Sequence, residues 1–359
     1  MNARLFQPMI VTLGLVALLG ADAPKRQMEI VWIDVDGGAA TLIVTPERES
    51  ILIDTGWPGF GDRDAKRIER VVRDACKLDH IDHLVTTHWH RDHFGGLGAL
   101  TKLVRIDHYW DRGLPDLDAP DQDAKKFPDG PKRDDPLGIA YRQASEGKRK
   151  TLKAGDRLPL KGDLRAIVLA SGGETISAEK RWGSERKSAG GDANRHCDDV
   201  VPDHPVDLSD NARSLAFLFE LGDFTFLDCG DLTWNVEKKL VCPVDLIGRV
   251  DLYQVTHHGL DLSNHPTLLR TIEPTVTIMN NGARKGCEPN TVAALKSIAS
   301  IRASYQLHKN PRARDADDTL IANATAAGGE FIRVRIEPDG KSFGVQAGER
   351  STVRSFASR

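Results

Sequence analysis

The sequence has no excess of charge of either sign. Lys and Arg total 49 against 52 Asp and Glu, which gives a formal net charge of −3, and aromatic residues make up only 6%. Without a net positive field, any binding of nucleic acid must be local. The balance of 40% hydrophobic and 28% charged residues over 359 positions is typical of a globular protein. It excludes collagen-like, disordered and multi-span membrane chains.

Cysteine is also scarce. The five cysteines have neither the spacing of a metal site nor the density of a disulfide framework; they are Cys76, Cys197, Cys229, Cys242 and Cys287. We interpret them as buried or unpaired thiols. A single bridge between Cys197 and Cys242 is the alternative.

One apolar run, from Met9 to Leu19, is too short to span a bilayer comfortably. Arg4 precedes it and the mostly small residues 20–23 follow it, which is typical of a secretory signal peptide. We therefore expect residues 1–23 to be a signal peptide. The mature protein would be exported to the periplasm or the extracellular space, with no stable membrane span after cleavage. An uncleaved anchor or a misassigned start is the alternative.

Alternating and helical apolar patterns predict a domain of α/β class over residues 28–348. Hairpins are predicted at 28–44, 214–227 and 331–345, and further strands at 51–53, 81–86, 151–160, 164–169, 250–255, 275–279 and 303–307. Helices are predicted at 65–75, 95–103, 265–272 and 289–300. Two polar stretches, at about 113–150 and 171–210, are interpreted as insertions in this domain.

Three histidines and a carboxylate occur within six residues, in the order His88-x-His90-x-Asp92-His93. They follow the strand predicted at 81–86, and loops at the carboxyl ends of strands often carry the sites of α/β sheets. Neutral imidazole and carboxylate suit Zn, Fe or Mn, and zinc is a common catalytic choice. One turn cannot close two metal sites, so we expect further ligands after later strands, from Asp231 and His257-His258.

These motifs and their order resemble the metallo-β-lactamase superfamily. The residues that make up these motifs are most similar to those in the hydrolase domain of ComEC-type competence proteins. The segments that carry the resemblance are Ile33-Asp34-Val35-Asp36-Gly37-Gly38-Ala39-Ala40, Asp54-Thr55-Gly56, the His88–His93 turn, Asn211-Ala212-Arg213-Ser214-Leu215, Gly230-Asp231 and His257-His258-Gly259. The resemblance covers about residues 28–310, and it implies an αββα sandwich with a dinuclear site at one edge of its two sheets.

The resemblance also implies a role for each site residue. His88 and His90 would hold one metal, Asp92 and His93 would hold the other, and Asp231 would bridge both. Either His257 or His258 would complete the second site, and spacing alone does not choose between them. Asp54 matches a position that usually braces the metal-binding turn.

The chain departs from the family at two positions. Asn211 stands near the place where many relatives carry a third histidine for the first metal. His196 or His204, in the preceding insertion, is the alternative source of that ligand. Where ComEC relatives often have a histidine just before a proline, this chain reads Cys287-Glu288-Pro289.

The resemblance implies a hydrolase with two divalent metal ions, for which Zn is the first expectation, and the expected signal peptide implies that this hydrolase is exported. A water whose pKa the metals lower would attack a carbonyl or phosphoryl centre, with Asp92 or Asp231 orienting the proton. We expect a phosphodiester substrate, because the motif sequences are most similar to those of nuclease-like proteins. A lactone, ester or β-lactam is the alternative small-molecule substrate, since one fold hosts many chemistries. A non-catalytic metal-binding module is the third hypothesis.

Several cationic residues offer charge for a phosphate oxygen. They are Arg91, Arg213, Arg284 and Lys285. The basic segment 180–187, which contains Trp182, is a candidate for binding a nucleic-acid strand by charge and stacking. A solvated surface is the alternative interpretation of each.

Overall fold

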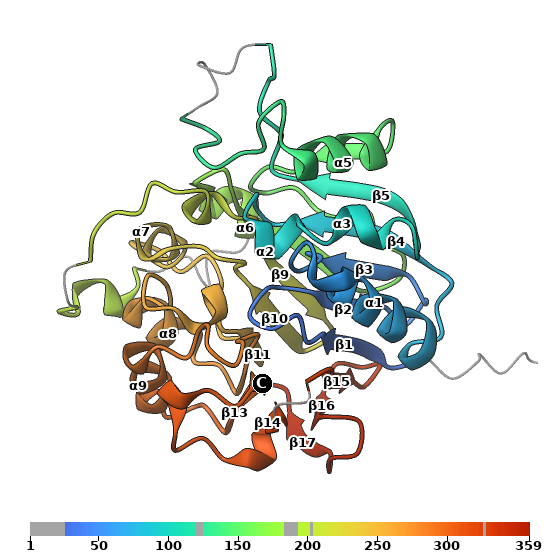
Figure 1. Cartoon of the computed structure of the whole chain (residues 1–359). Coiled ribbons are helices and arrows are strands. Elements are labelled where there is room, and N and C mark those ends of the chain that lie inside the picture. Colours follow the sequence, from blue (N-terminus) through green and yellow to red (C-terminus); the bar gives the residue numbers. More distant parts are fainter. Residues whose placement is uncertain (1–25, 119–124, 183–192, 202–203, 326–327) are drawn as a thin grey trace, which may run out of the picture.

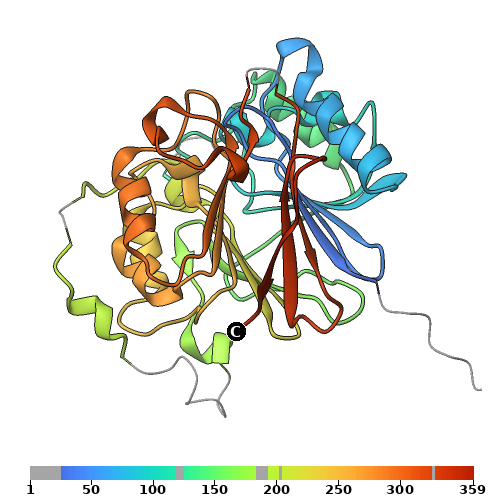
Figure 2. The same cartoon turned by 90° about the horizontal axis from the view of Figure 1, so that it is seen from below.

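The computed structural model describes residues 26–118, 125–182, 193–201, 204–325 and 328–359. Within these residues the strands form two mixed sheets, of nine and eight strands. The sheets pack face to face and helices cover both outer faces, as Figure 1 and Figure 2 show. The expected αββα sandwich is confirmed. The signal peptide expected at residues 1–23 lies outside the described residues.

The first sheet contains strands from both ends of the described chain. In spatial order its strands are β17 (Arg354–Ala357), β16 (Ser342–Ala347), β15 (Ile332–Ile336), β1 (Met28–Trp32), β2 (Thr41–Val44), β3 (Ser50–Ile53), β4 (His80–Thr86), β5 (Arg105–Asp111) and β6 (Arg149–Thr151). Pairing is antiparallel from β17 to β3 and parallel from β3 to β6. β17 extends this sheet beyond residue 348.

The second sheet changes direction in the same way. In spatial order its strands are β14 (Ile321–Asn323), β13 (Ala303–His308), β12 (Val276–Met279), β11 (Leu252–Gln254), β10 (Phe224–Asp228), β9 (Ala216–Leu221), β7 (Arg165–Ser171) and β8 (Glu174–Thr175). β10 to β14 are parallel, so the loops that follow them gather at one edge of the sheet.

Helices form the two outer layers. On the first sheet lie α1 (Arg63–Arg70, continued by a π-helical turn, Val71–Ala75), α2 (Arg91–Phe94), α3 (Leu97–Leu100) and α5 (Pro136–Ser145). On the second sheet lie α7 (Trp234–Glu237), α8 (Pro266–Ile272) and α9 (Pro289–Ser297), and the short α6 (Ala178–Trp182) follows β8. Each layer buries the apolar stripe of its helices against one sheet face.

Aromatic residues fill the space between the two sheets. Trp32 of the first sheet meets Phe226 of the second edge to face, with ring centroids 5.4 Å apart. Phe219 stacks on Phe226 at 5.5 Å. All three side chains are fully buried, and aromatic pairs of this kind contribute more than their buried area alone.

A buried polar chain also joins the two sheets beneath the site described below. Trp32 Nε1 donates to Gln254 Oε1 at 2.7 Å, and Gln254 Nε2 donates to Asp228 Oδ1 at 2.8 Å. Burial raises the pKa of Asp228 to about 7. These bonds fix the ends of β10 and β11, from which two of the predicted ligand segments emerge.

The local structure differs from expectation in three places. The helix expected at 95–103 is shorter, since only α3 (Leu97–Leu100) lies in that range and α2 ends before it. A Cβ on Gly96, between the two helices, would lie 2.1 Å from the Thr55 carbonyl oxygen, so the chain passes close to Thr55 there. Residues 152–160 form no strand, although one was expected from 151 to 160. The stretch 113–150 includes the helix α5, whose Tyr141 is fully buried against Trp89.

The bridge between Cys197 and Cys242, considered as the alternative, is present. Our interpretation of these two residues as unpaired thiols was therefore wrong, because the fold brings their Cα atoms to 5.7 Å across 45 positions of sequence. The remaining three cysteines are buried free thiols. Over the ranges the structure describes, no helix is long and apolar enough to cross a lipid bilayer.

The inter-sheet core makes a first prediction. Replacing Phe226 with Ala should lower the free energy of unfolding by about 3–5 kcal/mol, because it opens a cavity where both sheets meet. Urea unfolding followed by tryptophan fluorescence measures this change. Phe60, which is 70% exposed, is the matched control, and Phe60→Ala should change stability by less than about 0.5 kcal/mol. Equal effects of the two substitutions would contradict the assignment of this core.

Candidate metal centre

The His88–His93 turn begins just after β4 and ends within α2, which contains Asp92 and His93. The buried carboxylate of Asp54, which follows β3, holds this turn in place. Its Oδ1 accepts from the Thr87 backbone N–H at 2.8 Å, and its Oδ2 accepts from Thr87 Oγ1 at 2.7 Å and from His93 Nδ1 at 2.7 Å. Asp54 therefore fixes both the backbone of the turn and one imidazole ring.

Two segments of the second sheet reach the same place. Asp231 follows β10, and the His257-His258 pair follows β11. Both histidines have left-handed backbone conformations, with φ of 57° and 56°. Consecutive non-glycine residues in this region are uncommon and strained, and such strain is characteristic of functional sites. The conformation directs two adjacent imidazoles to different sides of Asp231.

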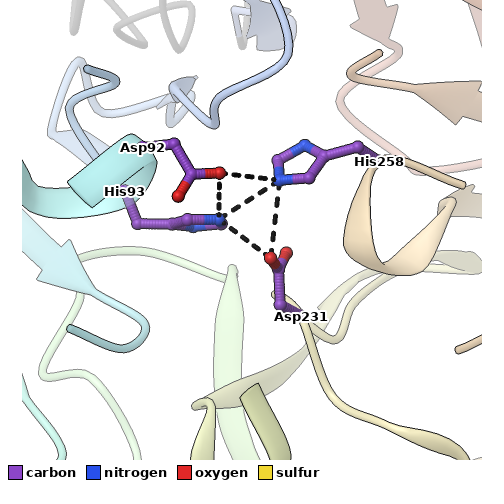
Figure 3. Close-up of side chains that lie close together, drawn as sticks. All are labelled: Asp92, His93, Asp231 and His258. Atoms are coloured by element: carbon purple, nitrogen blue, oxygen red, sulfur yellow. Dashed lines mark hydrogen bonds and ion pairs between the residues drawn. The ribbon is translucent and has the colours of Figure 1, made fainter. Parts of the chain in front are cut away.

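Four side chains converge in one buried cluster, drawn in Figure 3. Asp92, His93, Asp231 and His258 each offer one ligand atom, and these atoms lie within 4.8 Å of one another. His93 Nε2 is 3.1 Å from Asp231 Oδ2 and 3.3 Å from His258 Nε2. His258 Nε2 is 3.3 Å from Asp92 Oδ2. Oxygen and nitrogen atoms at these separations can surround a single cation.

Two further imidazole nitrogens lie near Asp231 but outside the four-residue cluster. His88 Nε2 is 3.8 Å and His257 Nε2 is 3.5 Å from the same atom, Asp231 Oδ2. Asn211 Nδ2 is 3.4 Å from His257 Nε2. Of the two adjacent histidines, it is thus His258 that joins the Asp92–His93 group, and His257 that lies with His88. An imidazole from β11 therefore stands beside Asn211, where relatives carry a third histidine.

His90 is oriented differently from the other histidines of the turn. Its ring centroid lies 4.7 Å from that of His88, but its Nε2 points to Asp129 Oδ2 at 3.3 Å. This contact leaves Nδ1 as the ring nitrogen available to a metal. Asp129 belongs to the first insertion, and its Oδ2 also accepts from the Asp210 backbone N–H at 3.1 Å. The two insertions therefore meet beside the metal-binding turn.

Each buried histidine of the site has one ring nitrogen engaged by the protein and the other facing Asp231. The engaged nitrogen is Nδ1 in every case: His88 with Thr87 Oγ1 at 3.1 Å, His93 with Asp54 Oδ2 at 2.7 Å, His257 with Ser263 Oγ at 3.1 Å and His258 with the Asn280 carbonyl at 3.2 Å. Such outer partners fix the tautomer and the orientation of metal-binding imidazoles.

An unsatisfied atom supports the fit of a metal to this site. His88 is fully buried, and its Nε2 has no hydrogen-bond partner among the described residues. A buried polar atom without a partner costs free energy, whereas coordination to a cation would satisfy it. The donor set of imidazole and carboxylate suits Zn, Fe or Mn. The residues present therefore fit divalent metal ions.

The charges in the cluster stabilise one another without a metal. Burial alone would lower the pKa of His93, but the carboxylates of Asp231, Asp92 and Asp54 raise it well above its usual value. Burial alone would raise the pKa of Asp231, but His93 and the His257-His258 pair hold it well below its usual range. A metal bound at Nε2 of His93 must displace the proton that these carboxylates stabilise, so metal binding and proton release are coupled.

Other candidates lie away from the cluster. His196 pairs with Asp199 at 3.0 Å, and the His204 ring packs 4.8 Å from that of Trp234, so neither supplies the third histidine. Cys287 is buried against Met279. Arg213 donates to the carbonyls of Leu208 and Lys125.

Four further contacts were missed by sequence reasoning. Asp129, Ser263 and the Asn280 carbonyl contact site histidines from loops whose sequence carries no ligand pattern. Lys285, considered only for its charge, forms an ion pair with Asp92. Signals of this kind depend on long-range packing, and local spacing does not reveal them.

Comparisons with known proteins match a family model over part of the chain and one curated relative over most of it. The model of the Metallo-beta-lactamase superfamily matches residues 33–163, which include Asp54 and the His88–His93 turn. Recombination protein 2 of Haemophilus influenzae is 22% identical over 275 residues, which are 76% of this chain and 26% of that protein. The chain thus spans about a quarter of the length of this relative.

Solved structures with similar arrangements were also found. CmlA, a diiron beta-hydroxylase from Streptomyces venezuelae, has a TM-score of 0.37 and 14% identity, with 78% of this chain and 48% of that chain covered. A putative metal-dependent hydrolase from Parabacteroides distasonis has a TM-score of 0.41 and 12% identity, with 79% and 94% covered.

The division of ligands predicts a distinct metal content for three variants. His257→Gln and His258→Gln should each keep about one of two metal equivalents, because each removes a ligand from one group only. Asp231→Asn should lose both, because Oδ2 faces both groups. Metal analysis after gel filtration measures the content, and His196→Gln is the control outside the cluster. Loss of both metals in either single histidine variant would contradict the division.

The contact between Asp129 and His90 predicts an effect from the insertion. Asp129→Asn should lower the affinity of the protein for the first metal, the one expected at His88 and His90, by roughly 10–100-fold, since outer carboxylates orient ligating imidazoles. Competition with a chromophoric chelator measures both dissociation constants. Asp134, an exposed carboxylate of the same insertion, is the matched control. If Asp129→Asn and Asp134→Asn bind metal equally well, the contact has no orienting role.

Proposed function

From a metallo-β-lactamase fold and a confirmed resemblance to that superfamily, we propose that this protein is a hydrolase with a dinuclear metal centre. One observation carries the proposal: a single buried atom, Asp231 Oδ2, lies within 3.8 Å of four imidazole Nε2 atoms. Two of these atoms belong to the four-residue cluster and two do not. A carboxylate so placed can bridge two cations. His88, His90 and His257 would hold the first, and Asp92, His93 and His258 the second.

When bound, divalent metals would supply a Lewis acid and would lower the pKa of a water, which provides a nucleophile near neutral pH. The protein's own residues position this chemistry. Asp54 fixes the His88–His93 turn, and Asp92 and Asp231 accept or orient the proton of the attacking water. The engaged Nδ1 atoms keep the imidazoles in the tautomer that binds through Nε2.

A phosphodiester is the substrate that we propose. The relative named Recombination protein 2 and the nuclease-like motif sequences support this substrate class. This chain spans only about a quarter of that relative. The basic segment 180–187 gives little support, since Arg181 is paired with Glu220 at 2.9 Å and Trp182 donates to the Asp245 carbonyl. Residues 183–187 lie outside the described residues.

We also propose that the protein acts after export. The bond between Cys197 and Cys242 supports this location, because disulfides persist mainly in oxidising compartments such as the periplasm. The apolar run at residues 9–19 supports it independently.

A panel of substrates tests the proposed activity. The metal-loaded protein should hydrolyse bis(4-nitrophenyl) phosphate or single-stranded DNA faster than nitrocefin or a lactone. His258→Ala should lower kcat/KM by more than about 100-fold, since losing a ligand exceeds the loss of an outer partner. His196→Gln is the control, and chelation followed by metal reloading should abolish and restore turnover.

Each outcome of this panel has a definite meaning. Turnover that survives complete metal removal would contradict the proposal. Turnover of nitrocefin or the lactone alone would favour the small-molecule alternative. Retention of two metals with no turnover of any substrate would favour a non-catalytic metal-binding module.

A further inference from the structure

The loop between β12 and α9, residues 280–288, is built tightly against the His257-His258 turn. A Cβ on Gly286 would lie 2.0 Å from the His258 carbonyl oxygen, so the two backbones are in direct contact. The Cys287 backbone N–H donates to the same oxygen at 3.3 Å. The side chain of Asn310 donates to the carbonyls of Gly282 and Lys285, at 3.0 and 3.4 Å. This loop has a fixed position relative to the ligand cluster.

Lys285 extends from this loop to the edge of the cluster. Its Cβ packs against Gly37, where an added Cβ would lie 2.9 Å away. Its Nζ lies 5.2 Å from the centroid of the Trp57 ring and forms an ion pair with Asp92 Oδ2. The Lys285 side chain is 30% exposed, against 9% for Asp92. The ammonium group therefore lies where the buried cluster meets solvent.

The partner of Lys285 is also a predicted ligand of the second metal. The ammonium forms an ion pair with Asp92, which also faces His93 and His258. When Asp92 binds a metal, its charge is shared with that metal and Lys285 loses most of its partner. A lysine ammonium is a compact cation with three donors, and it binds phosphate as a point charge.

We propose that Lys285 is the anion-binding residue of this site, and that it contacts a non-bridging phosphate oxygen of the substrate beside Trp57. This inference rests on the proposed function and specifies the substrate class further, as one that carries a negative charge next to the scissile bond. The Lys285 ammonium would thus pair with Asp92 when no metal is bound there, and with a substrate oxygen when Asp92 binds the metal. The same placement makes Lys285 a competitor of the second metal for Asp92.

These two roles predict opposite effects from one substitution. Lys285→Met keeps the length of the side chain and removes its charge. In the metal-loaded variant the dissociation constant for inorganic phosphate should rise about tenfold, because one charge-assisted contact is lost. The dissociation constant of the second metal should instead fall by about 3–10-fold, because a neighbouring cation has been removed.

Isothermal titration with inorganic phosphate and chelator competition for zinc measure the two constants. Lys285→Arg should keep phosphate affinity within about threefold, since it retains the charge. Lys309→Met is the matched control, because Lys309 is half exposed and pairs with Asp318 on another loop. Unchanged phosphate affinity in Lys285→Met would overturn the inference. A joint loss of phosphate and metal affinity would also overturn it, since Lys285 would then only hold Asp92 in place.

The binding experiment separates this inference from the proposed function. If the wild-type protein binds phosphate through Lys285 but hydrolyses no substrate, the proposed hydrolase is wrong and the anion site stands. If it is active, the ratio of kcat/KM for bis(4-nitrophenyl) phosphate to that for a neutral nitrophenyl ester should fall about tenfold in Lys285→Met. An active enzyme with an unchanged ratio would overturn the anion site and leave the hydrolase standing.

Discussion

The site depends on one buried carboxylate oxygen, Oδ2 of Asp231. Four imidazoles face it, and without such partners a buried negative charge would cost several kcal/mol. The position of Asp231 follows from the parallel pairing of β10 with β11, which brings the segments after these strands to one edge. The first sheet supplies the His88–His93 turn at the same edge. The αββα sandwich thus acts mainly as a frame that brings two loop systems together.

The insertions are part of this frame. Asp129 and Asp210 come from different insertions, yet they are joined by a hydrogen bond beside His90. Asp210 Oδ2 also accepts from the Trp89 backbone N–H at 2.7 Å, within the metal-binding turn. Stretches that look like polar surface in the sequence therefore contact the most constrained loop of the protein. The disulfide at Cys197 and the helix α5 secure the same two stretches to the two sheets.

The departures from the family pattern have a common physical explanation. Asn211 is a weak ligand, but the left-handed conformation of His257 brings an imidazole beside it, and His258 occupies the other side. The loop that carries Cys287 supports His258 through its backbone and presents Lys285 instead of a further histidine. The site therefore keeps several imidazole nitrogens around Asp231 and has the Lys285 ammonium group at its edge.

The sequence by itself determined the α/β class, most strands, the candidate metal-binding turn and the order of the candidate ligand segments. Apolar periodicity and the spacing of ligand-type residues are local properties, so the sequence shows them directly. The sequence could not assign His257 and His258 to different groups of ligands, because two adjacent residues lie at almost the same sequence distance from every other motif. Only the tertiary structure decided that division, through backbone φ angles and the position of Asp231. It also decided the roles of Asp129 and Lys285, whose partners lie 39 and 193 positions away and are selected by packing.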